Sequence, residues 1–292
     1  MDGVINVYKN KGMTSFDVVR KIKKIAATGK VGHTGTLDPE ACGVLPICIG
    51  KATKIIDYIM DSDKVYEVEF KLGIKTTTYD LEGEITEEKD PSNLGEKEIE
   101  EAISSFIGEY SQVPPMYSAL KQNGVRLYEL ARQGIEVPRE GRLVKIKEIT
   151  DICINNPYIK MKVRCSKGTY IRSLCYDIGE KLEVGATMID LKRTKTSNFS
   201  EEEAINIDDL TAENINDYLI SIDKALASYD KLIISSKFSK LLINGVKVFD
   251  KRLTNSKVEF GKLYRVYDEN EKFIGLGKGD IKGFKIEKLL II

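Results

Sequence analysis

The sequence is poor in the side chains that bind transition metals. Among its 292 residues there is a single histidine, His33. Its five cysteines form no C-x-x-C pair, although such pairs and histidine clusters are the usual zinc ligands. We therefore expect no metal site and no mechanism that needs two histidines.

A secretory leader and long apolar runs are also lacking. The odd number of cysteines does not suit a disulfide framework. Because disulfides are rare in the reducing cytosol, we interpret the chain as a reduced cytoplasmic protein. The cysteines are Cys42, Cys48, Cys153, Cys165 and Cys175.

Phosphate-binding loops of the common kinds are missing. Residues 43–53 read G-x-x-x-x-x-x-G-K-A-T, whereas a Walker loop needs four residues between its glycines and Ser or Thr directly after Lys. The G-x-G-x-G from Gly275 to Gly279 lacks the spacing of a dinucleotide site. These failures argue against a phosphate-using enzyme and against a nucleotide cofactor.

Net charge is absent as well. The chain has 45 Lys and Arg against 45 Asp and Glu, and its pI is about 6.7, a balance that argues weakly against a nucleic-acid partner. The average hides a segregation, because residues 80–101 hold ten acids and two lysines, whereas residues 142–195 hold twelve Lys and Arg and six acids. A neutral chain can thus present a basic face, although chance bias on solvated elements explains the same counts.

What is present is the periodicity of a mixed α/β protein. Apolar runs and alternation predict strands at residues 4–8, 44–49, 66–72 and 159–165. Helical spacing predicts helices starting near Thr14, over residues 52–59 and 99–107, and after Gly168. The apolar positions of the first helix are Phe16, Val19, Ile22 and Ile25.

The remaining segments are assigned by composition. Residues 29–43 are predicted to be a glycine-rich loop, and residues 113–138, with a Pro-Pro pair and an Asn-Gly turn, an excursion from the core. Residues 201–229 are acidic and predicted to be a helical bridge. Residues 231–292 predict a second, small, mostly β domain, and the chain length suits one large and one small domain.

The segment with most chemistry runs from Lys30 to Gly43 and reads K-V-G-H-T-G-T-L-D-P-E-A-C-G. Its glycines let the backbone approach a ligand, and Pro39 disfavours helical geometry at Asp38. A carboxylate on a loop between packed elements is a common catalytic placement. An Asp-Pro turn explains the same spacing, so the residues alone leave both interpretations open.

The same segment resembles the G-H-T-G-x-L-D-P motif of the TruB family of tRNA pseudouridine synthases. The resemblance continues in order over most of the range from Gly3 to Leu191. One departure is Asn10, where the family usually has proline, and it leaves that turn less rigid. The further matching segments read G-V-I-N-V-Y-K-N-K-G-M-T-S, D-S-D-K-V-Y-E-V, V-P-P-M-Y-S-A-L-K-Q-N-G-V-R-L-Y-E-L-A-R-Q-G-I-E-V-P and C-S-K-G-T-Y-I-R.

The resemblance implies a cofactor-free reaction at the T-loop uridine of tRNA position 55. The N-glycosidic bond breaks, the uracil turns in the pocket, and it rejoins the sugar through carbon 5. Asp38 would act as nucleophile or base. Arg172 would pair with Asp38 and hold it ionised and oriented, and Tyr170 would pack beside that pair.

Four more residues receive roles from the resemblance. The uridine must be flipped out of folded RNA, so His33 would enter the vacated stack and Tyr66 would stack on the uracil. Leu191 would form an apolar wall, and Lys9 would support the pocket. Without the resemblance, a surface-helix arginine explains Arg172 better and a core leucine explains Leu191 better. A capped loop histidine and one that enters the vacated stack explain His33 equally well, and Tyr66 at the start of its strand can be both a packed core residue and partly open.

The fold class implied is α/β (α+β), with a mixed central sheet, helices and an RNA-gripping thumb at about residues 113–138. This catalytic domain would span residues 1–230, and residues 231–292 resemble a PUA-type RNA-binding module. The partner would be tRNA, held by its T-arm and, through the C-terminal domain, its acceptor stem, with no membrane and a monomeric enzyme. The alternative is an RNA-binding module without catalysis, and the presence of Asp38 and Arg172 argues against it.

Overall fold

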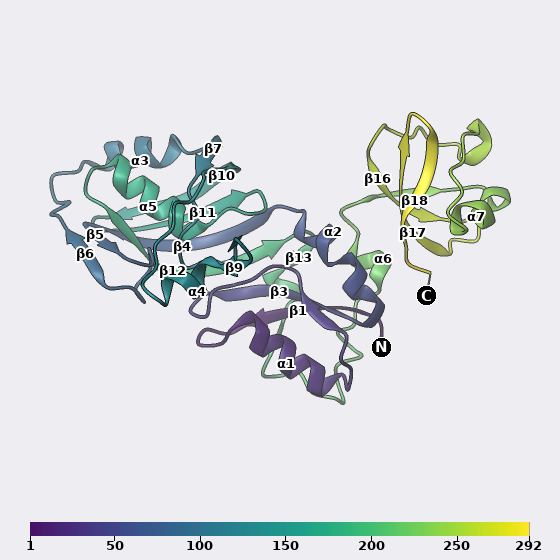
Figure 1. The fold of residues 1–292 in the computed structure, drawn as a ribbon, viewed down its shortest axis with the longest axis horizontal. Coiled ribbons are helices and arrows are strands. Elements are labelled where there is room, and N and C mark those ends of the chain that lie inside the picture. Colours follow the sequence, from purple (N-terminus) through teal and green to yellow (C-terminus); the bar gives the residue numbers. More distant parts are fainter. Residues whose placement is uncertain (292) are drawn as a thin grey trace.

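The larger part of the molecule is built on one mixed sheet with helices against it, as the computed structural model of residues 1–291 shows (Figure 1). Eight strands follow the order β14-β1-β3-β12-β4-β11-β10-β7, with β2 paired to β3 and β13 paired to β12. The ten strands are β1 (Gly3–Lys9), β2 (Val31–His33), β3 (Cys42–Ile49), β4 (Lys64–Leu72), β7 (Gly108–Gln112), β10 (Arg142–Asn155), β11 (Tyr158–Cys165), β12 (Ala186–Thr196), β13 (Phe199–Ser200) and β14 (Ile205–Asn206).

The sheet is mixed because two of its neighbouring pairs are parallel. Strand β3 pairs with β12 in parallel, as β1 does with β14, and the other pairs are antiparallel. Two short hairpins lie outside the sheet, formed by β5 (Ile74–Thr76) with β6 (Ile85–Glu88) and by β8 (Lys121–Gln122) with β9 (Val125–Arg126). The helices of this part are α1 (Ser15–Ile25), η1 (Gly50–Ile55), α2 (Ile56–Met60), α3 (Glu96–Ser104), α4 (Leu127–Ala131), α5 (Ile171–Lys181), η2 (Glu201–Glu203) and α6 (Ile222–Ala225).

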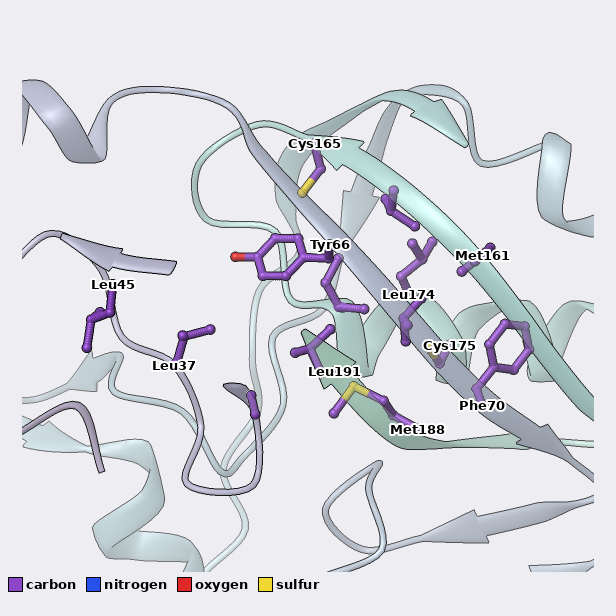
Figure 2. Packing of buried hydrophobic residues seen from close by; sticks show 14 of the residues in the cluster. Leu37, Leu45, Tyr66, Phe70, Met161, Cys165, Leu174, Cys175, Met188 and Leu191 are labelled. Atoms are coloured by element: carbon purple, nitrogen blue, oxygen red, sulfur yellow. The ribbon is translucent and has the colours of Figure 1, made fainter. Parts of the chain in front are cut away.

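The main core lies on one face of this sheet. In β4, Tyr66, Val68 and Phe70 are buried while Glu67 is exposed, as the alternation predicted. Figure 2 shows Tyr66 and Phe70 together with Leu174 of α5. Helices α1, α3 and α5 contribute apolar residues to the same cluster, so each of them covers this face.

Helix α1 is predicted well from local sequence. The Thr14 side chain accepts from the Asp17 backbone, and the Asp17 carboxylate accepts from the Thr14 backbone, which is a capping box. Val19 and Ile22 are buried as predicted, but Phe16 is 58% exposed, so its assignment to the apolar face is wrong. Its ring instead lies under the cations of Arg20 and Lys23.

Three further predictions of local structure need correction. Residues 201–229 are mostly turns, with only η2 and the four-residue α6 helical. Asn206 and Asn214 bind nearby backbone groups through their side chains, and such local bonds favour turns over a continuous helix. The predicted helix at residues 52–59 is a 3₁₀ turn followed by the short α2, and the predicted loop at residues 29–43 contains strand β2.

The C-terminal lobe has its own sheet, of order β15-β16-β17-β18 (Figure 1, yellow-green and yellow). A separate apolar cluster that includes Leu232, Phe238 and Val266 fills it. Leu276 and Leu290 instead join a second cluster that contains residues of β1, β3 and η1, so the lobe packs on the larger part. Its elements are β15 (Asp230–Ile233), α7 (Ser236–Ile243), η3 (Lys251–Leu253), β16 (Leu263–Tyr267), β17 (Phe273–Asp280) and β18 (Gly283–Leu289).

These features confirm the predicted fold class, a mixed α/β protein with a large central sheet and a β-rich C-terminal domain. The division at residue 230 and the PUA likeness remain predictions. Within residues 1–291, no helix has the length and apolar character needed to cross a membrane.

Candidate active site

Asp38 lies on the loop between β2 and β3, and the buried Lys9 holds this loop in place. The Lys9 ammonium donates to the carbonyls of Asn10, Met13 and Pro39 at 2.9, 2.8 and 3.0 Å. Lys9 is 0% exposed, and burial lowers its pKa to about 8. One side chain thus joins the end of β1, the turn before α1 and the residue that follows Asp38.

A second anchor lies just before Asp38. The Ser15 hydroxyl, in the first turn of α1, accepts from the Leu37 backbone N–H at 2.8 Å and donates to the Leu37 carbonyl at 3.0 Å. Leu37 itself is 3% exposed and packs in the main core. The backbone on both sides of Asp38 is therefore fixed, which orients its carboxylate.

The Arg172 guanidinium grips that carboxylate with two nitrogens. Its Nε lies 3.0 Å from Asp38 Oδ2, and its Nη2 donates to Asp38 Oδ1 at 3.2 Å. Such a two-pronged pair fixes the plane of a carboxylate. Arg172 sits in the first turn of α5, 134 positions from Asp38, so the contact predicted between them is present.

Arg172 also binds a second carboxylate, that of Asp80, which sequence reasoning missed. Nη1 lies 3.1 Å from Asp80 Oδ2 and donates to the Thr78 carbonyl at 3.2 Å, while Nη2 donates to the Tyr117 carbonyl at 2.9 Å. Asp80 was visible in the sequence only as the first member of the acidic segment. Its neighbour Tyr79 has positive φ, which an isolated sequence does not reveal.

Burial and these charges act on Asp38 in opposite directions. Burial raises the pKa of Asp38, the Arg172 guanidinium lowers it, Asp80 raises it and the Lys9 ammonium lowers it. Protein surrounds most of the carboxylate, yet 35% of the side-chain surface stays accessible, against 6% for Arg172. The carboxylate is thus partly desolvated and still reachable by a ligand.

Tyr170 precedes Arg172 and is held through its backbone. Gln112, which is 1% exposed, accepts from the Tyr170 N–H at 2.8 Å and donates to the Tyr170 carbonyl at 3.1 Å. Burial raises the pKa of the Tyr170 hydroxyl. Gln112 ends β7, where the predicted thumb begins. After residues 113–141 the chain returns to the sheet as β10, which pairs with β7.

Tyr66 and Leu191 come together in the main core. Tyr66 is 8% and Leu191 6% exposed, and both share a cluster with Leu37. Figure 2 shows the Tyr66 hydroxyl directed toward the side of the cluster where Leu37 and Leu45 lie. Burial raises the pKa of Tyr66, and the nearby Arg193 guanidinium opposes this effect. The ring and Leu191 thus form an apolar surface with one polar atom.

His33 ends β2, five residues before Asp38. Its Nδ1 accepts from the Gly35 N–H at 3.3 Å. Burial, followed by the charge of Arg193, lowers the pKa of His33, so the ring is neutral at pH 7. Within residues 1–291 it forms no hydrogen bond with Asp38, Arg172 or Tyr66.

Comparison with known proteins assigns the family. The model of the TruB family pseudouridylate synthase N-terminal domain matches residues 23–171, just over half of the chain. This chain belongs to the TruB family. The model of the tRNA pseudouridylate synthase B C-terminal domain matches residues 172–233, so the pseudouridylate synthase models together span Arg172 and both of its carboxylates.

Relatives of this TruB-family chain extend over its whole length. It is 64% identical over 292 residues to a tRNA pseudouridine synthase B of Clostridium perfringens (strain SM101 / Type A), covering all of this chain and 99% of the relative. The protein of the same name from Clostridium novyi (strain NT) is 57% identical over 291 residues, with 100% of each chain covered. The chain is therefore an enzyme of this family.

Solved structures agree with this assignment. A crystal structure of a Cbf5-Nop10-Gar1 complex contains a chain with 28% identity and a TM-score of 0.77, covering 99% of this TruB-family chain and 85% of that chain. A structure of an H/ACA RNP bound to a substrate RNA containing 2′-deoxyuridine contains another, at 25% identity and a TM-score of 0.75, with the same coverage.

Two cavities of the TruB-family chain lie away from these residues. One, of about 440 Å³, is lined by charged residues that include Asp63, Lys162 and Arg164, and the other, of about 450 Å³, lies near Lys89 and Pro157. No group of three or more His, Cys, Asp or Glu within residues 1–291 is placed to hold a metal ion. Neither cavity is lined by a residue predicted for the site.

Proposed function

We propose that this protein converts the T-loop uridine at position 55 of tRNA to pseudouridine, with Asp38 as the catalytic carboxylate. The two-nitrogen contact between Arg172 and the partly open Asp38 carboxylate is the observation that carries this proposal. A carboxylate that is fixed in plane, desolvated and still accessible suits attack at an electron-poor sugar carbon. The relatives named tRNA pseudouridine synthase B support tRNA as the substrate.

The surrounding residues suit a base that has left its stack. The Tyr66 ring and Leu191 provide an apolar surface, and stacking of an aromatic ring on a base contributes about 1–3 kcal/mol. His33 is neutral at pH 7 because its pKa is lowered by burial, so its flat ring can replace the flipped base without carrying a buried charge. Lys9 supports the site by holding the backbone next to Asp38.

The thumb and the C-terminal lobe would contact RNA outside the pocket. Residues 113–138 contact the site through the Tyr117 carbonyl, which accepts from Arg172. Closure of the thumb on the T-arm would therefore affect the contact between Arg172 and Asp38. The C-terminal lobe, as a PUA-like domain, would reach the acceptor stem. As part of the proposal, the enzyme acts as a monomer in the cytoplasm.

A direct experiment tests the function. Purified protein is incubated with a tRNA transcript, and pseudouridine is mapped at single-nucleotide resolution by chemical sequencing. Conversion confined to the T-loop uridine supports the proposal. Tight tRNA binding without any conversion would instead favour an RNA-binding module that has lost catalysis.

A further inference from the structure

Arg193 is the largest side chain in the set that is almost completely buried, with 1% of its surface exposed. Its guanidinium donates to the carbonyls of Val44, Gly35 and Thr36 at 2.8, 3.2 and 3.5 Å. No carboxylate lies within 4.0 Å of it in residues 1–291, in contrast to Arg172. The interior beside the Asp38 loop therefore contains a cation with no counter-ion.

Burying a charge in this way lowers the stability of the fold unless other interactions of the charge compensate for it. An arginine does not lose its proton inside a protein, and burying an ion without an opposite charge is strongly unfavourable. Lys9 is also fully buried on three carbonyls, and there the contacts account for the residue. Arg193 differs from Lys9 in the part of the site that its charge faces.

The position of Arg193 relates it to three parts of the site. In the pairing of β12 with β4 it is the direct partner of Tyr66, so both side chains project from the same face. It binds the loop carbonyls two and three residues before Asp38. Gly43 lies so close that a Cβ there would be 2.2 Å from the Arg193 carbonyl oxygen, and its φ is +108°. The end of that loop is therefore pressed against β12.

The charge reaches titratable groups on four strands. In each case the charge lowers the pKa of the neighbouring group. Burial raises the pKa of the tyrosine and the cysteine and so opposes this effect, whereas burial lowers the pKa of the other groups and adds to it. The groups are Lys9 on β1, His33 on β2, Lys64 and Tyr66 on β4, and Cys165 on β11. A positive potential thus extends to the Tyr66 hydroxyl, where the uracil would stack.

We infer that Arg193 is a positioning residue that acts through Tyr66: it orients the Tyr66 hydroxyl and the Asp38 loop, and its uncompensated charge stabilises the uracil anion formed during isomerisation. This inference rests on the proposed function. When the C1′–N1 bond breaks, its electron pair leaves with the base and the uracil becomes an anion, while the sugar carbon is left electron-poor beside Asp38. A fixed cation aimed at developing negative charge stabilises it without reorganisation.

The first test compares Arg193→Lys with wild type in single-turnover reactions at saturating enzyme from pH 6.5 to 9.5. A lysine here should have a lowered pKa, as the buried Lys9 and Lys64 do at about 8. The rate of the variant divided by that of wild type should therefore fall about tenfold as pH rises through 8, because the buried charge disappears. Using this ratio removes the pH dependence of the groups whose pKa the substitution leaves unchanged. The matched control is Arg20→Lys on α1, where the arginine side chain is 62% exposed, and its ratio should stay flat.

The second test uses Arg193→Gln with uridine and with 5-fluorouridine in the T-loop of the same RNA. Fluorine makes the uracil anion more stable, so the variant should cleave the glycosidic bond of uridine roughly a hundredfold more slowly than wild type but show a clearly smaller defect with 5-fluorouridine. RNA affinity should change by less than about threefold. A flat pH ratio for the Lys variant, or an equal Gln defect on both RNAs, would overturn the inference.

The two proposals fail in different ways. If wild-type protein produces no pseudouridine, the proposed function is wrong. If wild type is active and the Arg193 variants match it, only the role of Arg193 is wrong. If Arg193→Gln does not fold, as judged by circular dichroism, the pH ratio of the Lys variant decides alone.

Discussion

At the scale of single residues, one guanidinium serves two carboxylates. Within residues 1–291, Asp38 and Asp80 form ion pairs with Arg172 and with no other cation. Because Asp80 raises the pKa of Asp38 while Arg172 lowers it, removing Arg172 leaves two carboxylates facing each other. The consequence is a larger effect on Asp38 than the loss of one isolated ion pair would have.

Changing Arg172 should therefore produce a defect that depends on pH. In Arg172→Met the pKa of Asp38 should rise, so activity should be lowest near neutral pH and recover partly as pH increases and more Asp38 ionises. Arg172→Lys keeps a charge but loses the planar grip, so it should be less impaired and recover less. We expect activity in the order wild type, Lys variant, Met variant in single-turnover pH profiles.

RNA affinity supplies the control for these variants. It should change little in both, because affinity arises from phosphate contacts spread over the surface. Circular dichroism checks the fold. A Met variant with the same activity as wild type at every pH would show that Arg172 controls neither the ionisation nor the orientation of Asp38.

From sequence alone, residues could be proposed for the site only where a local motif existed. Asp38, Arg172 and Tyr66 lie in motifs that resemble a family, whereas Asp80 and Arg193 were visible only as charges in the acidic and basic segments. The alternation of Leu191 with Arg193, both on one face of a strand, was the available signal for a buried arginine. Its meaning depends on pairing with Tyr66, which no short segment of sequence contains.

At the scale of elements, local signals and long-range packing account for the successes and the failures. Helix α1 carries its own capping box at Thr14, and β4 alternates clearly, so both could be predicted. Strand β12 escaped prediction because buried polar residues such as Thr187 and Arg193 interrupt its apolar pattern. Residues 201–229 look helical in composition but wrap the sheet mostly as turns, since tertiary packing overrides propensity.

Lys9 joins three elements at an energetic cost that depends on pH. Its pKa is about 8 in the folded protein because of burial, against about 10.4 in an unfolded chain. Between these values the unfolded state binds more protons, so the free energy of unfolding should rise with pH. Wild type should gain on the order of 2–3 kcal/mol relative to Lys9→Met between pH 7.5 and 10.

Urea unfolding of both proteins across this pH range measures the difference. The control is Lys97→Met, since that side chain is 89% exposed on α3, and its difference from wild type should stay constant. A constant difference for Lys9→Met too would show that the ammonium is not desolvated as the contacts indicate. The same variant should lose activity, because the backbone beside Asp38 loses its anchor.

At the scale of the whole molecule, the two β-rich parts pack against each other through a shared apolar cluster. Leu276 and Leu290 pack with Val4 and Ile55, and the Arg265 side chain donates to the Tyr229 carbonyl at 2.8 Å. Removing the C-terminal lobe would therefore expose core residues of the larger part. Surface substitutions test its role in RNA binding more cleanly than truncation.

Phe249 and Phe260 are suitable surface positions for this test. They are 83% and 74% exposed, and exposed aromatic rings stack on unpaired bases with about 1–3 kcal/mol per base. If the lobe contacts the acceptor end, the double substitution to Ala should weaken binding of whole tRNA about tenfold and leave binding of an isolated T-arm unchanged. Filter-binding titrations on both RNAs measure this.

Ile281→Ala is the matched control, because this side chain is 80% exposed but cannot stack. Its affinity for whole tRNA should stay within about twofold of wild type. Equal losses on whole tRNA and on the T-arm for the phenylalanine variant would mean that the lobe does not recognise a region beyond the T-loop.

The central claim is that Asp38 carries out isomerisation of one uridine. The most direct measurement is pseudouridine formation in a purified T-arm stem-loop by wild type and by Asp38→Asn, with gel-shift titration of both proteins on the same RNA. We predict stoichiometric conversion by wild type, none by the Asn variant, and affinities within a few fold of each other. Substantial turnover by Asp38→Asn would contradict the account.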